Sequence, residues 1–130
     1  DLLLFYRDYH PASQLAAAEL LPAAAAQDMG VVAATVLAGG LFTAGPKHDS
    51  LLQTIEAEQG GEERQRLDAI LTRLSAETGT LPQQAFRYVL GDARVSTVSS
   101  GAASIAQLEE VAASPELGRL EHFAPDPEPA

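Results

Sequence analysis

The feature that most constrains the fold is a nearly continuous apolar run, Val31 to Leu37, followed by Gly39-Gly40. A strand with one solvated face alternates apolar and polar residues, whereas this run is apolar at almost every position. Such a run is typical of a parallel strand that is covered on both faces. Two glycines at its end let a ligand or another backbone approach closely. The run therefore predicts an α/β fold.

Two further strand candidates and several helices surround this run. Leu2 to Tyr6 is a short apolar segment that predicts a first strand, and Val95 to Ser99 predicts a third. Helices are expected over Gln14 to Asp28 and, from apolar residues at helical spacing, over Glu62 to Thr78. The alternation of strands and helices indicates right-handed βαβ units around a parallel sheet.

Proline and glycine mark the expected ends of the helices. Pro22 should kink or end part of the first helix, and Gly30 is placed where a helix-ending glycine is common. Thr43 to Gly61 holds several glycines, which predicts a long excursion with about one helical turn. Thr80 should cap a further short helix that has Pro82 near its first turn.

Composition excludes several classes of function. The 130 residues correspond to one domain, and 8 basic against 18 acidic residues give a net charge of -10. This charge argues against a nucleic-acid binder or an anchor on anionic lipid. The absence of cysteine excludes disulfides and thiolate metal sites. No apolar run reaches the length of about 18 residues that a membrane span needs.

The first residues suggest that the chain is part of something longer. Asp1 leads directly into an apolar strand, without the basic region and cleavage site of a secretory signal. Three strands alone would leave two apolar sheet edges unpaired, so we expect further strands on the N-terminal side. The lack of a signal and of cysteines favours a cytoplasmic protein. The proline-rich, acidic tail, Ala124 to Ala130, is predicted to be disordered.

Few side chains stand out as catalysts. His10 follows the first strand, where α/β proteins place active sites, but a turn residue is the favoured interpretation. Tyr6 and Tyr9 lie close by, and aromatic packing is their favoured interpretation. His48 and His122 are far from His10 in sequence, and no spacing among the three suggests a metal site.

The segment Ser99 to Ser104 is a loop of small residues between the third strand and a helix expected over Ile105 to Ala113. Such a loop offers backbone N–H groups and a positive helix end to a phosphate. The alternative is a tight turn in which Ser104 only caps the helix. Neither standard glycine-rich nucleotide fingerprint is present.

Several blocks, taken in order, resemble the C-terminal part of an aldo-keto reductase, and most closely the fucose/galactose dehydrogenase-like group. The segment A-A-T-V-L-A-G-G-L, for example, is similar to the end of the family's seventh barrel strand. The blocks comprise residues 1–10, 19–22, 30–41, 84–90, 92–98, 101–104 and 107–110. The resemblance implies the C-terminal portion, about strands six to eight, of a (β/α)8 barrel over residues 1–123.

The resemblance also implies a function. The family transfers hydride between NADP or NAD and a carbonyl or sugar substrate, and its catalytic side chains come from the N-terminal half of the barrel. We therefore assign no catalytic residue and no metal ligand to this chain, and expect the missing N-terminal half as its partner. The implied cofactor contacts are Tyr6, Ala34, Thr35, Leu37, Gly39, Gly101, Ala102, Gln107 and Glu110.

Each implied contact has a place along the cofactor. Tyr6 and Ala34 correspond to positions near the nicotinamide, although alanine cannot stack on the ring as an aromatic does. Thr35, Leu37 and Gly39 correspond to positions along the pyrophosphate.

The positions around the adenosine depart from the family pattern. Gly101 and Ala102 fall where the 2′-phosphate of NADPH is bound, but Gly101 replaces a basic residue. Gln107 stands where an arginine is frequent, and Glu110 falls near the adenine. Val111 replaces an asparagine that bonds the adenine amino group. The missing cations favour NADH over NADPH.

Two other interpretations stay open. The departures are also expected of a degenerate, non-catalytic barrel that acts as a binding or regulatory protein. A self-associating half-barrel, which covers its own edges by pairing with a second copy, is the third.

Overall fold

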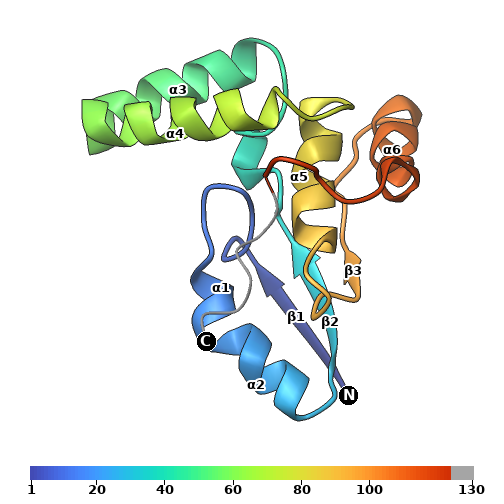
Figure 1. Ribbon diagram of the computed structural model, residues 1–130. Coiled ribbons are helices and arrows are strands. Elements are labelled where there is room, and N and C mark those ends of the chain that lie inside the picture. The colour runs from blue at the N-terminus through green and yellow to red at the C-terminus, as the bar shows by residue number, and fades with distance from the viewer. Residues whose placement is uncertain (124–130) are drawn as a thin grey trace.

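The computed structural model describes residues 1–123, and the predicted disordered tail, Ala124 to Ala130, lies outside them. Strands and helices alternate along these residues, with a helical hairpin projecting from one end of the sheet (Figure 1). The elements are β1 (Leu2–Tyr6), α1 (Leu15–Ala18), α2 (Leu20–Ala26), β2 (Gly30–Ala34), η1 (Ala38–Gly40), α3 (Pro46–Gln59), α4 (Gly61–Leu74), α5 (Leu81–Leu90), β3 (Thr97–Val98), α6 (Ile105–Ala112) and η2 (Ser114–Leu117).

The strands form one parallel sheet in the order β1-β2-β3. β1 has the predicted bounds, and its last residue, Tyr6, pairs with Ala34 at the end of β2. The α/β class with a parallel sheet is thus confirmed. Because parallel strands share one direction, the chain leaves β1, β2 and β3 at the same edge of the sheet.

Two strands are shorter than predicted. β2 ends at Ala34 rather than Leu37, because Thr35 adopts a left-handed backbone conformation (φ 59°) that no strand can continue through. β3 spans only Thr97–Val98 within the predicted segment. The N–H groups of Ser96 and Ser99 still donate to the carbonyls of Val31 and Ala33, which keeps the longer segment beside β2.

The two faces of the sheet differ. Phe5, Val31 and Ala33 are buried in the core. On the opposite face of β1, Leu2, Leu4 and Tyr6 are 66%, 60% and 62% exposed. The sequence predicted helices on both faces of the sheet. Within residues 1–123, helices cover one face only.

Pro22 divides the first helical segment as predicted. The break lies at Glu19 (φ -132°, ψ -47°), between α1 and α2. In a continuous helix the ring of Pro22 would clash with the carbonyl of the residue four positions earlier, and proline has no N–H to donate to that carbonyl. The prediction that Gly30 ends the helix is wrong. Asp28 takes the left-handed conformation there (φ 51°), and Gly30 already begins β2.

The excursion predicted over Thr43 to Gly61, with about one helical turn, is also wrong. α3 runs for 14 residues and packs antiparallel to α4 (Figure 1). Leu52 is buried, and Leu51 and Ile55 are partly buried against the core. Gly60, at φ 96°, supplies the left-handed turn that reverses the chain between the two helices.

α5 is the central helix of the core. The predicted cap at Thr80 is confirmed: its Oγ1 accepts from the Gln83 N–H, and Gln83 Oε1 accepts from the Thr80 N–H at 2.9 Å. Every residue from 84 to 89 is buried, so α5 has neighbours all round. None of the helices within residues 1–123 combines the length and apolarity that crossing a bilayer requires.

Residues 117–123, which we call the C-terminal strap, pass across α5 (Figure 1). The buried guanidinium of Arg87 donates to the carbonyls of residues 117, 118 and 119. The buried carboxylate of Glu77 accepts from the N–H groups of residues 121, 122 and 123. Arg73 lies 4.0 Å above the ring of Phe123. Two buried charges thus hold the strap through its backbone.

Candidate functional site

A cleft of about 910 Å³ lies at the edge of the sheet where β2 and β3 end. Residues 34–47 form one wall, residues 99–111 form the other, and the start of α5 lies between them. The carboxyl edge of a parallel sheet is where α/β proteins bind their ligands. Of the nine implied contacts, eight line this cleft: Ala34, Thr35, Leu37, Gly39, Gly101, Ala102, Gln107 and Glu110.

Tyr6 is the candidate that does not line the cleft. Its backbone pairs with Ala34, which does, so Tyr6 is one strand away from the cleft wall. The Tyr6 side chain lies on the open face of the sheet.

The wall after β2 is an unusual backbone turn. Thr35 and Ala38 have φ of 59° and 51°, and Gly39 and Gly40 continue at 70° and 113°. A left-handed conformation costs a non-glycine residue about 1 kcal/mol or more, and such strain is concentrated at functional sites. Val36 is buried within the turn and anchors it to the core. The strain marks this turn as a candidate ligand contact independently of its sequence.

The opposite wall is the loop that leads into α6. The predicted cap is confirmed, because Ser104 Oγ accepts from the Gln107 N–H at 3.1 Å. Gln107 Oε1 in turn accepts from the Ala103 N–H at 2.8 Å. Among residues 1–123, the exposed N–H groups of Gly101 and Ala102 have no acceptor. The loop therefore keeps backbone donors beside a positive helix end, which suits an anion.

Two charged side chains occur among the residues that line the cleft, Lys47 and Glu110. Lys47 is in the first turn of α3, and its methylenes cover Gly40, where an added Cβ would lie 3.3 Å from Cε. Lys47 is not among the residues predicted from the sequence, because residue 47 was expected to lie in a loop. The signal that could have found it is the position of a lone cation shortly after the two glycines that end the strand.

Apolar side chains close the bottom of the cleft. Phe86 and Val111 are buried there, and Leu81 is partly buried. The Gln83 amide donates to the carbonyl of Glu110 at 2.8 Å, which ties α6 to the start of α5. The wall that carries Glu110 is thus held by the core helix.

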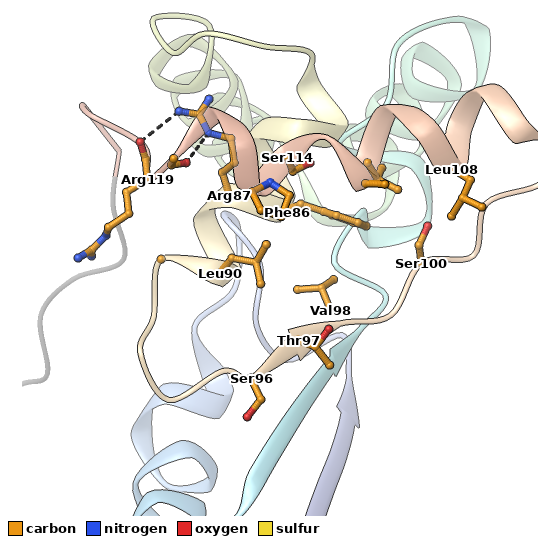
Figure 2. Close-up of a pocket in the computed structure, with 15 residues that line it drawn as sticks. Phe86, Arg87, Leu90, Ser96, Thr97, Val98, Ser100, Leu108, Ser114 and Arg119 are labelled. Atoms are coloured by element: carbon orange, nitrogen blue, oxygen red, sulfur yellow. Dashed lines mark hydrogen bonds between the residues drawn. The ribbon is translucent and has the colours of Figure 1, made fainter.

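A second cavity of about 630 Å³ lies on the other side of Phe86, Ser100 and Val111, which line both spaces. Figure 2 shows Leu90 and Val98 beside it, beneath α6. Its walls are mainly apolar. Ser114 Oγ, at the edge of this space, is buried and has no hydrogen-bond partner within residues 1–123.

Tyr9 is a packing residue, as its favoured interpretation predicts. It is 2% exposed, and its ring lies 6.0 Å from that of Tyr88. Its hydroxyl donates to Asp92 Oδ2 at 2.8 Å, and Arg94 Nη2 binds the same oxygen. Burial, together with Asp92, raises the pKa of Tyr9, so this hydroxyl keeps its proton.

His10 also belongs to the core, in a tight turn that pairs it with Ser13. Its Nδ1 accepts from the Ala12 N–H at 3.2 Å, and its ring lies 5.6 Å from that of Phe42. Burial lowers the pKa of His10 to about 4, with a smaller effect from Arg66. The interpretation of His10 as a turn residue is confirmed. Across residues 1–123, no three His, Asp or Glu side chains come together as a metal site would require.

Comparison with known proteins gives one result at the level of the family. A comparison with curated proteins finds no match. The model of the aldo/keto reductase family matches residues 2–122, which include all three strands and both walls of the cleft. The chain therefore belongs to the aldo/keto reductase family.

Proposed function

We propose that the cleft binds a nicotinamide dinucleotide, NADP or NAD, for hydride transfer to or from a carbonyl or sugar substrate. Membership of the family supports an oxidoreductase function. One observation carries the proposal: eight residues chosen as cofactor contacts, from two distant segments of the sequence, line a single cleft. The dinucleotide, when bound, supplies or accepts the hydride.

The chemistry of the cleft fits such a ligand. The N–H groups of Gly101 and Ala102, in the loop before α6, can donate to a phosphate. Lys47 supplies a cation to the wall after β2. Gly39 has no atom within 4 Å of the place a Cβ would take, so a pyrophosphate can approach its backbone. Ala34 leaves room for the nicotinamide beside the open sheet face, next to Tyr6.

We assign binding, and not catalysis, to this chain. Tyr9 and His10, two of the proton-carrying groups that follow β1, are buried in the core. Neither can exchange a proton with a substrate in the cleft from that position. In this proposal the acid/base group is supplied by strands that cover the open face of the sheet.

Those strands are the proposed partner of this chain. Leu2, Leu4 and Tyr6 form an exposed apolar row on β1, which is costly to leave in water. The N-terminal half of a (β/α)8 barrel would pack on this row and pair with the outer edges of β1 and β3. Cover by a second copy of the chain is the competing arrangement.

A second function is favoured by Val111. Because this buried side chain cannot bond the adenine amino group, the chain also fits a degenerate barrel that acts as a binding or regulatory protein. The two functions differ in one measurable property, which is dinucleotide affinity.

Titration of the chain with NADH and NADPH, followed by nicotinamide fluorescence, tests the proposal. We expect saturable binding that Ala102→Trp weakens at least about tenfold, because the indole fills the cleft. The control is Ala106→Trp, which places the same ring on an exposed position of α6 outside the cleft. Absence of binding at millimolar dinucleotide contradicts the proposal and favours the regulatory function.

Two further measurements test the absence of catalysis by this chain and the proposed N-terminal partner. Turnover of a carbonyl or sugar substrate by this chain alone would contradict the assignment of catalysis to other strands. The mass in solution tests the partner: a discrete dimer would support self-association instead of barrel completion.

A further inference from the structure

The second cavity, beneath α6, has no part in the proposed function. Its volume of about 630 Å³ lies within the range of sites that hold small organic ligands, roughly 300 to 1,000 Å³. Its walls come from α5, β3, α6 and the C-terminal strap (Figure 2). The larger apolar side chains among them are Phe86, Leu90, Val98, Leu108, Val111 and Pro115. A ligand with an apolar body would therefore bury its surface against these walls.

The charge of the cavity is opposite to that of the chain. The chain has 18 acidic and 8 basic residues, yet the charged residues that line the cavity within residues 1–123 are two arginines, Arg87 and Arg119. The guanidinium of Arg87 is occupied, since it donates to the carbonyls of Thr78 and of the strap. The exposed side chain of Arg119 makes no hydrogen bond or ion pair within residues 1–123. The cavity thus offers one cation to a ligand.

Ser114 adds an unused hydroxyl. The residue is 0% exposed and lines the cavity, and its Oγ has no hydrogen-bond partner within residues 1–123. Buried hydroxyls are nearly always paired, because an unpaired one loses the bonds it made to water. Ser114 and Arg119 belong to one short stretch, residues 114–119, whereas Leu108 lies on the far side of the cavity from Arg119 (Figure 2). Polar groups at one end and apolar walls at the other suit an amphipathic ligand.

We propose that this cavity binds an amphipathic carboxylate, such as a medium-chain fatty acid. The apolar body packs beneath α6 against Leu90, Val98 and Leu108, and the carboxylate accepts hydrogen bonds from Arg119 and Ser114. Arginine suits a carboxylate because its planar donors match the two oxygens. The inference goes beyond the proposed function, because it assigns a second ligand to a space outside the cleft, and it does not depend on dinucleotide binding.

Calorimetric titration of the chain with octanoate tests the proposal, and 1-octanol is the neutral control with the same tail. We expect saturable binding of octanoate with a dissociation constant below about 1 mM, and binding of 1-octanol at least about fivefold weaker, because the alcohol makes no charge-assisted bond. Arg119→Met should weaken octanoate binding about fivefold and leave 1-octanol binding unchanged. Arg119→Lys keeps the charge and should bind octanoate within about threefold of the parent chain.

Ala112→Trp tests the location of the site. Ala112 lines this cavity from an exposed position at the end of α6 and does not line the cleft. The indole should fill the cavity and weaken octanoate binding at least about tenfold. The control is Ala106→Trp, at an exposed position of α6 that lines neither space, and it should keep the affinity of the parent chain. Circular dichroism and the urea midpoint establish that each variant is folded.

Three results would overturn the proposal. The first is absence of octanoate binding by the parent chain. The second is octanoate binding that neither Arg119→Met nor Ala112→Trp weakens. The third is equal affinity for octanoate and 1-octanol, because a cavity that accepts any apolar group is one that a side chain of a partner protein would fill.

Discussion

The C-terminal strap and the cleft use polar groups in opposite ways. Under the strap, Arg87 is 3% exposed and Glu77 is 7% exposed, and each is surrounded by backbone groups that it bonds. In the cleft, Lys47 and the N–H groups of Gly101 and Ala102 are exposed, and these N–H groups have no acceptor within residues 1–123. One region has satisfied its hydrogen bonds internally, and the other has kept donors available.

This difference predicts that the buried charges under the strap contribute to stability, whereas the exposed donors of the cleft contribute to binding. A buried charge whose partners are mainly backbone atoms contributes to folding, and its removal leaves several groups unsatisfied. An exposed donor beside a cleft contributes little to folding, so its removal should affect only what the cleft binds. Substitutions in the two regions should therefore give opposite patterns of stability and affinity.

The largest effect is expected for Arg87→Met. The methionine keeps the packing of the side-chain stem but leaves the carbonyls of Thr78 and of the strap without their donor. We expect a loss of about 3 to 5 kcal/mol in the free energy of unfolding, measured by urea titration of circular dichroism.

The control for this change is Arg119→Met on the strap itself, where the arginine side chain is exposed. We expect less than about 0.5 kcal/mol of change for this variant. Equal losses for the two variants would show that the guanidinium of Arg87 is not what holds the strap.

Protonation of His10 should have the next largest effect on the free energy of unfolding, and this effect appears only at acidic pH. The pKa of His10 is lowered to about 4 in the folded chain by burial, against 6.5 for an ordinary histidine. The unfolded chain therefore binds more protons between these values, and stability falls as the pH drops from 6.5 to about 4. The full span corresponds to about 3 kcal/mol.

His10→Asn should remove this dependence, because asparagine keeps an acceptor for the Ala12 N–H and does not titrate. The measurement is the free energy of unfolding at several values between pH 7 and pH 4. The exposed His122 is the matched control, and His122→Asn should retain the slope of the parent chain. A slope that survives in His10→Asn would refute the assignment.

Glu77→Gln should cost about 1 to 3 kcal/mol at pH 7, because a neutral amide accepts the three strap N–H groups less strongly than a carboxylate. Burial alone would raise the pKa of Glu77, but the three backbone donors outweigh it and lower the pKa below the ordinary value. Its contribution is thus present above about pH 4.3 and is lost as the pH falls through the lowered pKa. The difference between Glu77→Gln and the parent chain should shrink below pH 4.3; a constant difference contradicts this account.

Local signals in the sequence predicted some of these elements and could not predict others. The cap at Thr80 and the bounds of β1 follow from a few adjacent residues, and both are confirmed. α3 was missed because its core contacts are limited to Leu51, Leu52 and Ile55, which gives a weak helical pattern. β2 ends early because the backbone of Thr35 adopts the left-handed conformation. Threonine rarely takes this conformation, so the sequence gives no sign of it.

Local sequence pointed to the two segments that wall the candidate site, the glycines after β2 and the loop of small residues before α6, but most individual contacts were predicted only through the family resemblance. Gly101 and Thr35 carry no chemistry that marks them as contacts, and the fold is what brings their segments to one cleft. Lys47 could not be placed without the start of α3. The burial of Glu77 and Arg87 was equally unpredictable from the sequence, because charged residues in a helical segment are usually exposed. The C-terminal strap is what buries them.

The smallest effect, and the sharpest contrast with Arg87, is expected for Lys47→Gln. Lys47 makes no ion pair or hydrogen bond within residues 1–123, so its charge is available to the cleft and contributes little to folding. Loss of one cation near a phosphate should weaken NADH binding about fivefold, or about 1 kcal/mol, and leave the urea midpoint unchanged. The weakening should decrease as salt is raised, because the exposed charge is screened.

The control Lys47→Arg keeps the charge and should bind NADH within about twofold of the parent chain. Unchanged affinity in Lys47→Gln would remove Lys47 from the site, and a lowered urea midpoint would place it with Arg87 among the residues that stabilise the fold.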